Sequence, residues 1–351
     1  MLSDKEVAFL REELSTAQNP LFFYDDDGDG LCAFLLLYRM KHEGCGSILK
    51  TSSKLDASFM RKVDEYHPDK IFILDIPMVE QEFVDKAKRP IFWIDHHEPQ
   101  QIQNVHYFNP KIKEPDSYIP TSRMAYQVSN NPEDLWLATV GCLFDWHMPN
   151  FIGEFIEKYP HLLSEKTDLK TAVYEQPIGK LVRMFSFLLK GKHSDVMNSI
   201  KILTRIKSPD EILQQQTSQG KFLFKHFSEV NSRYLPLIKS AKKKVGKGKV
   251  IVFTYSELHW SFTIDLANEL TAHNPEKVII IARKKSEEMK CSLRAQFPID
   301  KALAKALIGV EGYGGGHPHA CGAAIKEKDW ERFLKNFKEE IEKEKESQRE
   351  K

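Results

Sequence analysis

The chain has 351 residues, a length that usually corresponds to roughly two or three domains. Hydrophobic residues make up 41% of it and charged residues 29%, which excludes a largely disordered chain. The 51 Lys and Arg residues balance 50 Asp and Glu residues, and the formal net charge of +1 excludes a uniformly basic nucleic-acid binder. A local basic patch stays open, because a sum over the whole chain hides any separation of charge.

The five cysteines are scattered and never form a Cys-x-x-Cys pair, so the sequence indicates neither a disulfide framework nor a cysteine zinc site. The charged N-terminal residues 1–14 lack an apolar core of signal-peptide length. The apolar runs of the chain are far shorter than a membrane span. We therefore expect a soluble, cytoplasmic protein that does not associate with a membrane.

Short apolar strands alternate with helical stretches in the first 150 residues. Strands are expected at Pro20–Tyr24, Lys70–Leu74 and Pro90–Ile94, and a helix is expected over Leu31–Lys41. This alternation predicts βαβ units and a parallel sheet. Polar residues follow each strand directly, and ligands of open α/β sheets bind at the carboxyl ends of the strands.

The pattern changes twice in the rest of the chain. Helical spacing predominates from about Asp134 to Leu237, and a new α/β pattern begins at Lys249, after the Lys- and Gly-rich candidate linker Ser240–Gly248. The predicted fold class is α/β, with an N-terminal parallel-sheet domain, a helical connector and a smaller C-terminal α/β domain. The expected segments are 1–150, a helical region and linker at 151–240, the C-terminal domain at 241–338, and a charged helix or tail at 339–351.

An acidic run follows the first predicted strand and contains Asp25, Asp26, Asp27 and Asp29. In extended or turn geometry alternate residues point the same way, so Asp25, Asp27 and Asp29 are expected to converge while Asp26 faces elsewhere. Converging carboxylates repel one another unless they are protonated or neutralised by cations. A solvent-exposed acidic turn is the alternative. A calcium EF-hand is disfavoured, because its glutamate would fall at position 36, where the chain has Leu36.

Further acidic and imidazole side chains follow other apolar segments. Asp75 follows the second predicted strand, Asp95, His96 and His97 follow the third, and Asp145 ends an apolar helical stretch. Each of these residues alone could be an ordinary structural polar group. Together they supply carboxylates and imidazoles without thiolates, a ligand set that suits Mn²⁺ or Mg²⁺ better than structural zinc. Two such ions about 3.5–4 Å apart are a common device for phosphoester cleavage.

The C-terminal domain carries a glycine-rich run at 312–324, GYGGGHPHACGAA. A polyglycine turn exposes backbone N–H groups that can cradle a phosphate, and His317 could donate to the same group. Ser292 and Arg294, on a predicted strand, could contact another phosphate. A flexible glycine hairpin with surface histidines is the alternative.

Residues 231–256 form a basic stretch that contains seven Lys or Arg residues and no acid. Such a stretch could follow the phosphate backbone of a nucleic acid. A solvated hydrophilic linker is the alternative.

The acidic run, the Asp75 strand end, the Asp-His-His triplet at 95–97 and Asp145 resemble the four sequential motifs of the DHH phosphoesterase superfamily. The glycine-rich run with the Ser-Leu-Arg segment at 292–294 resembles the associated DHHA1 domain. The first motif lacks a preceding histidine, so the chain looks like a RecJ-like single-strand nuclease. Because there is no room after residue 326 for the added OB-like domain of bacterial RecJ, it looks like the minimal, archaeal-type form. The resemblance implies that 1–150 is a DHH catalytic domain and 241–338 a DHHA1 substrate-binding domain.

The resemblance also implies roles for individual residues. The implied metal ligands are Asp25, Asp27, Asp29, Asp75, His96 and Asp145. Asp75 would bridge two Mn²⁺ ions, with Mg²⁺ as the alternative metal, and His97 would stabilise charge or orient water beside the scissile phosphate. Asp95 would fix a histidine tautomer. The residues that would hold the substrate phosphate or the terminal nucleotide are Ser292, Arg294, Gly315, Gly316 and His317.

We therefore expect a two-metal phosphodiesterase, an exonuclease that releases nucleotides from single-stranded DNA or RNA. Its partners would be single-stranded nucleic acid or oligonucleotides, with replication or repair proteins as further candidates. One alternative is an enzyme for short substrates, namely di- to pentanucleotides or cyclic dinucleotides. Another is a non-catalytic replication or repair scaffold, which is disfavoured because every expected ligand position holds Asp or His.

Overall fold

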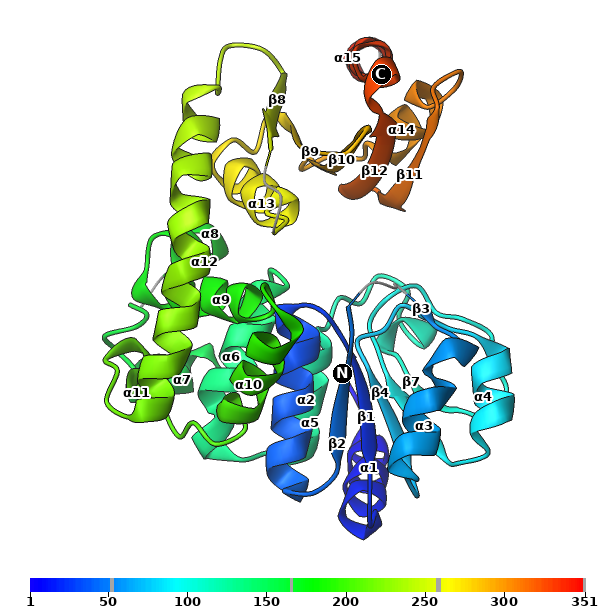
Figure 1. Cartoon of the computed structure of the whole chain (residues 1–351), viewed down its shortest axis with the longest axis vertical. Coiled ribbons are helices and arrows are strands. Elements are labelled where there is room, and N and C mark those ends of the chain that lie inside the picture. The colour runs from blue at the N-terminus through cyan, green and yellow to red at the C-terminus, as the bar shows by residue number, and fades with distance from the viewer. Residues whose placement is uncertain (51–53, 165–166, 257–259, 350–351) are drawn as a thin grey trace. The chain divides into compact units, whose positions relative to one another are not determined.

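The computed structural model describes residues 1–50, 54–164, 167–256 and 260–349 of the chain (Figure 1). It divides into two compact units, Met1–Phe227 and Ser228–Lys351. The division lies within the long helix α12 (Ser218–Lys243), earlier in the chain than the boundary expected near residue 240. Because α12 continues to Lys243, the first residues of the expected linker are helical. The predicted α/β fold class is confirmed.

The N-terminal unit is built on a parallel sheet. Its strands are β1 (Leu21–Asp25), β2 (Cys45–Leu49), β4 (Ile71–Leu74), β6 (Ile91–Ile94) and β7 (His106–Phe108), in the order β2-β1-β4-β6-β7. A small second sheet pairs β3 (Lys54–Leu55) with β5 (Met78–Val79). The expected strands at β1, β4 and β6 are apolar and almost wholly buried, as required of strands covered on both faces. The shorter or more polar β2 and β7 carry no such signal, and the sequence pattern does not predict them.

Helices cover both faces of this sheet. They are α1 (Asp4–Thr16), α2 (Gly28–Lys41), α3 (Met60–Tyr66), α4 (Gln81–Ala87), α5 (Thr121–Ser129) and α6 (Leu135–Phe144). On one face, Val63 of α3 and Phe83 of α4 pack into a core with Phe23 of β1. On the other, Phe34 of α2 contacts Phe22 of β1, with ring centroids 5.7 Å apart.

Helix α1 contacts the carboxyl end of helix α5 through hydrogen bonds. The Arg11 guanidinium donates hydrogen bonds to the carbonyl oxygens of Val128 (2.6 Å) and Gln127 (2.9 Å). A cation at this end of a helix is favourable, because the last carbonyl groups have no intrahelical partner and carry partial negative charge. These contacts fix the carboxyl end of α5 against α1.

The expected helical region is present. It consists of α7 (Ile152–Lys158), α8 (Leu169–Tyr174), α9 (Pro177–Leu188), α10 (His193–Leu203) and α11 (Pro209–Leu213), followed by α12. Short 3-10 turns lie at Ala57–Phe59 (η1), Pro110–Ile112 (η2), Pro132–Asp134 (η3) and Glu327–Asp329 (η4). Trp136 of α6 and Phe185 of α9 meet edge to face, with centroids 5.9 Å apart, and join this region to the sheet-covering helices.

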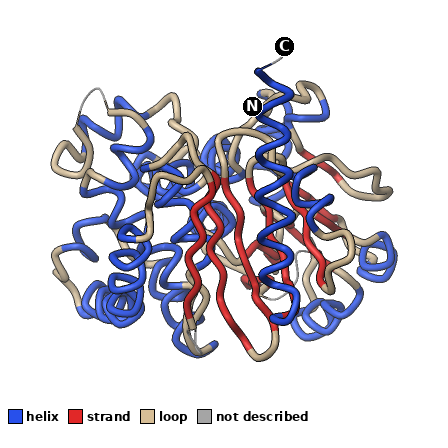
Figure 2. Tube along the Cα trace, turned by 90° about the horizontal axis from the view of Figure 1, so that it is seen from above, coloured by secondary structure: helices blue, strands red, loops and turns tan. Residues whose placement is uncertain are grey.

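The C-terminal unit contains a second, mixed sheet. Its strands are β8 (Val250–Tyr255), β9 (Val278–Lys285), β10 (Glu288–Arg294), β11 (Gly312–His317) and β12 (Ala320–Lys326), in the order β11-β12-β10-β9-β8. Its helices are α13 (Thr263–His273), α14 (Asp300–Ala306) and α15 (Trp330–Arg349). Phe333 and Phe337 of α15 bury their rings in a core with Leu293 and Ile325 of the sheet. In Figure 2 the helix that leads to the C-terminus, α15, runs across strands of this sheet. The charged tail expected at 339–351 is, as far as Arg349, a continuation of α15.

The glycine-rich run is a strand rather than the expected polyglycine turn. Gly312–His317 forms the edge strand β11, which pairs antiparallel with β12 and is exposed along its length. The turn of this hairpin is made by Pro318 and His319. In the part of the chain that the structure describes, no helix is both long and apolar enough to cross a membrane.

Gly141 of α6 gives a test of the packing between α2, α5 and α6. A Cβ atom there would lie 2.8 Å from Cys32 Cβ and would also collide with the Ser122 hydroxyl. We expect Gly141→Ala to lower the free energy of unfolding by about 1–3 kcal/mol, the usual cost of overpacking. Urea denaturation measures this change.

Gly153 of α7 supplies the matched control, because an added Cβ there meets nothing within 4 Å. Gly153→Ala is expected to leave stability unchanged or to raise it by about 0.5–1 kcal/mol, because glycine is a poor helix former. Equal effects of the two substitutions would contradict the packing assigned to Gly141.

Candidate active site

The acidic run occupies the turn from β1 into α2. Asp25 ends β1, Asp27 is the N-cap of α2, and its side chain accepts a hydrogen bond from the Gly30 backbone N–H at 2.9 Å. Asp29 lies in the first turn of α2 and is fully buried. The three carboxylates are therefore presented by a strand-to-helix turn, not by the alternation of an extended chain. Gly30 is needed at this turn, because a Cβ atom would lie 2.9 Å from the Asp25 backbone.

The site unites every side chain that the sequence predicted as a metal ligand. Three groups of side chains have ligand atoms within 4.8 Å of one another: Asp25 with Asp27 and Asp75, Asp29 with His96 and Asp145, and Asp75 with His96 and His97. Asp75 and His96 each belong to two of these groups, so the groups form one connected cluster. His96 Nε2 lies 3.2 Å from Asp75 Oδ1 and 3.3 Å from Asp145 Oδ2. We call this set the acidic cluster.

Asp75 reaches the cluster through an unusual backbone conformation. Its φ angle is +61°, in the left-handed region, directly after the last residue of β4. Aspartate and asparagine adopt this region more readily than most other non-glycine residues. The Asp75 side chain is almost fully buried, and Oδ1 accepts a hydrogen bond from the Thr121 hydroxyl at 3.1 Å.

The amino end of α5 holds Asp29. The backbone N–H groups of Thr121 and Ser122 donate to the two carboxylate oxygens of Asp29, at 2.7 and 3.1 Å, and the Ser122 hydroxyl donates as well. A carboxylate is favourable here because the first N–H groups of a helix have no intrahelical acceptor. Sequence analysis missed Thr121 and Ser122. The available signal was Pro120 followed by Thr and Ser ahead of an apolar run, a pattern typical of a helix start.

Asp95 orients His97. His97 Nδ1 lies 2.7 Å from Asp95 Oδ1, and the His97 backbone N–H donates to Asp95 Oδ2 at 3.1 Å. Tyr107 and Asn109 donate further hydrogen bonds to the fully buried Asp95, at 3.2 and 3.3 Å. An ionised carboxylate only accepts hydrogen bonds, so Nδ1 of His97 carries a proton. Nε2 is then the nitrogen through which His97 can act on a substrate.

Tyr118 is a further residue at the cluster that the sequence did not reveal. Its hydroxyl donates to Asp145 Oδ2 at 3.2 Å, and its ring centroid lies 5.4 Å from that of His96. Tyr118 precedes α5 in a loop without a strand or helix pattern, so no periodicity pointed to it. It is 48% exposed and forms a border between the buried carboxylates and solvent.

The carboxyl groups of the cluster are difficult to ionise together. Burial, with the neighbouring charge of Asp27, raises the pKa of Asp25 to about 8. Burial, followed by the charge of Asp145, raises the pKa of Asp29 to about 7. Burial and the charge of Asp27 likewise raise the pKa of Asp145 to about 7. Bound divalent cations would remove this penalty, so the donor set of carboxylates and imidazole fits a site for Mn²⁺ or Mg²⁺.

The pKa values of the two histidines of the cluster shift in opposite directions. Burial lowers the pKa of His96, which favours the neutral form that can ligate a metal. Burial also opposes the charge of His97, but the hydrogen bond and the charge of Asp95 outweigh it and raise the pKa of His97. His97 is therefore suited to meet an anionic group in its cationic form.

Asp26 stands outside these groups, as its position in the acidic run predicted. Burial raises the pKa of Asp26 to about 6, against the opposing charges of Lys50 and Lys190. Its carboxylate therefore faces a pair of lysines.

The strand register of the C-terminal unit places most of the predicted substrate residues on one sheet face. Ser292 pairs with Gly322, which pairs with Gly315; Arg294 pairs with Ala320, which pairs with His317. Residues paired across antiparallel strands share a face, as do residues two apart on one strand. Gly316 falls on the opposite, core-facing side, and its φ of +141° requires a glycine.

The side chains of Ser292 and Arg294 contact α13. The buried Ser292 hydroxyl donates to the Thr263 hydroxyl at 3.0 Å, and Arg294 Nε donates to Asn268 Oδ1 at 2.9 Å. A Cβ atom at Gly315 would meet nothing within 4 Å. The edge of this face therefore presents bare backbone beside Arg294 and His317.

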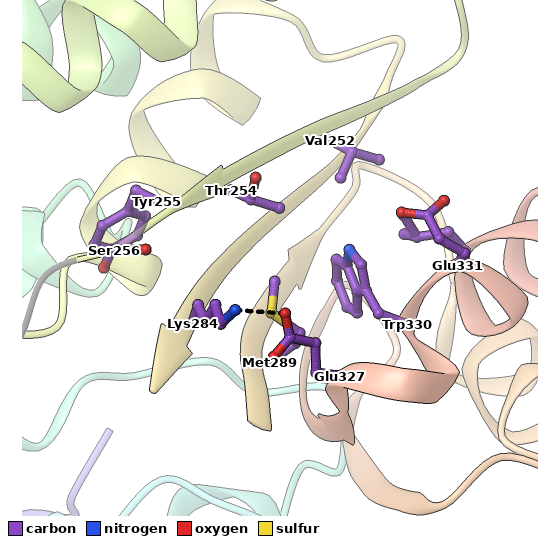
Figure 3. A pocket seen from close by; sticks show the side chains of 10 residues that line it. Val252, Thr254, Tyr255, Ser256, Lys284, Met289, Glu327, Trp330 and Glu331 are labelled. Carbon is purple, nitrogen blue, oxygen red and sulfur yellow. Dashed lines mark hydrogen bonds and ion pairs between the residues drawn. The ribbon is translucent and has the colours of Figure 1, made fainter. Parts of the chain in front are cut away.

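A separate hollow of about 720 Å³ lies on the other side of the same unit (Figure 3). Val252 of β8 and Trp330 of α15 border it, and Lys284 and Glu327 form an ion pair at its wall. None of the predicted substrate residues lines it.

Family models match both units of the chain. The model of the DHH family N-terminal domain matches residues 21–150, and the DHHA1 domain model matches residues 247–343. The chain contains a DHH-family N-terminal domain followed by a DHHA1 domain. A search of curated protein sequences finds no match.

Solved structures of DHH proteins share the fold. RecJ from Thermus thermophilus in complex with Mn²⁺ has a TM-score of 0.68 and 16% identity, over 95% of this chain and 54% of that one. The DHH domain of a member of the s1p family of ribosomal proteins has a TM-score of 0.69 and 15% identity, over 96% and 89%. Another exonuclease RecJ, bound to manganese, has a TM-score of 0.63 and 16% identity, over 95% and 93%. The chain spans about half the length of the Thermus RecJ.

The raised pKa values predict an unusual dependence of stability on pH. Asp25, Asp29 and Asp145 move from a pKa of 3.8 to about 8, 7 and 7 on folding. Between about pH 4 and pH 8 the folded protein therefore binds more protons than the unfolded chain, and stability falls as pH rises. We expect the Tm of the protein in chelator to fall from about pH 5 to about pH 8.

The variant Asp145→Asn is the matched comparison, because it removes one of these carboxyl groups. Its Tm should fall less steeply over the same interval. Parallel curves for the variant and the native chain, or a Tm that rises with pH, would contradict the assignment.

Proposed function

We propose that the chain is a metal-dependent phosphodiesterase that releases nucleotides from the ends of single-stranded DNA or RNA. The observation that carries the proposal is the acidic cluster, in which Asp75 and His96 each join two groups of potential metal ligands. The cluster lies in a DHH domain that is followed by a DHHA1 domain. The RecJ structures with the same fold support the nuclease assignment, and they contain Mn²⁺ or Mg²⁺.

Two ions, Mn²⁺ or alternatively Mg²⁺, would be held by the acidic cluster. Asp25 and Asp27 would hold one ion, Asp75 would be shared, and the ligands of the other would be Asp29, His96 and Asp145. When bound, such a pair activates a water molecule and stabilises the charge that grows on the phosphate oxygens. Thr121 and Ser122 would orient Asp29 toward its ion and favour its ionised form through their three hydrogen bonds.

His97 would act on the substrate itself. Asp95 fixes its Nδ1, and the raised pKa of His97 favours the cation, so Nε2–H can donate to a phosphate oxygen beside the cluster. In its neutral form the same nitrogen can orient the attacking water.

The sheet face of the C-terminal unit would hold the end of the substrate. Arg294 and His317 supply cationic or donor groups, and Gly315 leaves room for close approach of a nucleotide. Gly316 would contribute through its backbone, because glycine has no side chain. Ser292 would act by positioning Thr263 and α13, because its hydroxyl is buried and already engaged.

The substitution Asp75→Asn tests the mechanism. Asparagine tolerates the left-handed backbone and can still accept the Thr121 hydrogen bond, but it removes the charge shared between the two ions. We expect the rate of cleavage with Mn²⁺ to fall by more than about a hundredfold, with the fold retained by circular dichroism.

Asp85→Asn, on the exposed surface of α4, is the control and should cleave at the native rate. Native activity of purified Asp75→Asn protein would contradict a metal site centred on this residue.

A substrate-length series tests the choice of substrate. With Mn²⁺, labelled single strands of about 30 nucleotides should be degraded with a higher kcat/KM than a pentanucleotide or a dinucleotide, because added phosphates and bases add contacts. Both DNA and RNA series are needed. Efficient cleavage restricted to the dinucleotide would instead identify an enzyme of short substrates.

A further inference from the structure

A groove of about 360 Å³ runs along the free edge of the N-terminal sheet. It lies between β2, the segment from η1 into α3, and the amino end of α10. β2 is an edge strand, paired only with β1 in this sheet, and Figure 1 shows α3 and α10 on either side of it. We call this feature the β2 groove. None of the residues assigned to the acidic cluster lines it.

The lining of the β2 groove is basic and aromatic. Arg61, Lys62 and His193 supply cationic or ionisable groups, and Phe59 and Tyr66 supply rings. Among the described residues that line the groove, none is acidic. Lys62 lies 2.9 Å from Glu65, outside the lining, and its ammonium group is 5.3 Å from the Tyr66 ring centroid. Arg61 and His193 are exposed. A positively charged groove with rings for stacking is the combination that binds single-stranded nucleic acid.

The strand register connects this groove to the acidic cluster. Ile48, which lines the groove, pairs with Tyr24, and the next pair is Leu49 with Asp25, a member of the cluster. Neighbouring strands lie about 4.8 Å apart, so the end of the groove that Ile48 lines lies near the acidic cluster. Lys50 follows directly after Leu49 at this edge.

Two lysines lie near Asp26 of the acidic run. Lys50 Nζ donates to the Leu189 carbonyl oxygen at 2.9 Å, which brings Lys50 beside Lys190 at the end of α9. Both lysines act electrostatically on Asp26, the residue between the cluster members Asp25 and Asp27. Cations at this position suit phosphate groups that pass from the cluster toward the groove.

The segment that carries Lys190 is held in place by specific contacts. His226 Nε2 lies 2.9 Å from the Lys190 carbonyl oxygen, and His226 Nδ1 lies 2.8 Å from the Ser199 hydroxyl. Gly191 has a φ of +123°, and a Cβ atom there would lie 3.2 Å from His226 Nε2. The segment then leads into α10, which begins at His193 in the groove. Lys190 and His193 are thus presented by one fixed turn.

We propose that the β2 groove binds nucleotides of a single-stranded nucleic acid whose phosphate backbone passes Lys50 and Lys190 and reaches the acidic cluster. This inference rests on the proposed nuclease function and specifies its substrate as a strand longer than a dinucleotide. Arg61 and His193 contact phosphates, and Phe59 and Tyr66 provide surfaces on which bases stack.

Binding of a labelled oligothymidylate of about 20 nucleotides tests the groove without any need for catalysis. Affinity is measured by fluorescence anisotropy in chelator over a series of salt concentrations, for the native chain and for Arg61→Ala. Loss of one phosphate contact should weaken binding severalfold at low salt and reduce the slope of log K against log salt by about 0.7. His193→Ala is expected to weaken binding in the same direction.

Arg205→Ala is the matched control, because Arg205 is an exposed arginine just beyond the opposite end of α10. It should bind like the native chain. Native affinity and slope in both Arg61→Ala and His193→Ala, with Tm unchanged, would overturn the inference, as would an equal loss in Arg205→Ala. If the native chain binds the strand but does not cleave it with Mn²⁺, the nuclease proposal is wrong. The affinities of the variants still test the β2 groove in that case.

Discussion

Repulsion among buried carboxylates is the constraint on which the N-terminal unit depends. Parallel strands bring Asp25, Asp75 and their neighbours to one edge of the sheet, where burial and mutual charge raise the pKa values of most of them. The protein meets this cost locally, with the N–H groups at the start of α5, the hydroxyl groups of Thr121 and Tyr118, and His96. Ionising these buried carboxylates together costs free energy, even with the hydrogen bonds that they accept. Bound cations would lower this cost.

The chemistry of the cluster was predictable, because ligand-type residues directly follow apolar strands and parallel strands end at a common edge. The supporting contacts were not. Thr121 and Ser122 act through backbone groups, which any residue possesses, and Tyr118 lies in a loop without periodicity. The glycine run was predicted as a turn because glycine favours turns, yet pairing with β12 makes it an edge strand. The sequence offered such a hairpin only as the alternative, because glycine has a low strand propensity.

The two units use glycine and register in different ways to expose a site. In the N-terminal unit, Gly30 lets α2 begin against the end of β1 and so packs ligands tightly. In the C-terminal unit, Gly315 leaves open space on a sheet face that also carries Arg294 and His317. The first arrangement gathers buried carboxylates, and the second is an exposed strand edge with few side chains. This difference fits the roles in cleaving and holding a substrate that are proposed for the two units.

The start of α5 also makes the acidic cluster observable from the backbone. The Thr121 amide proton points at a carboxylate oxygen of Asp29, while Arg11 holds the other end of the same helix. The shielding of an amide proton depends on the charge of its acceptor. The resonance of Thr121 would therefore shift whenever Asp29 gains a proton or a cation, and a single isotope-labelled residue would act as a built-in indicator of the state of the site.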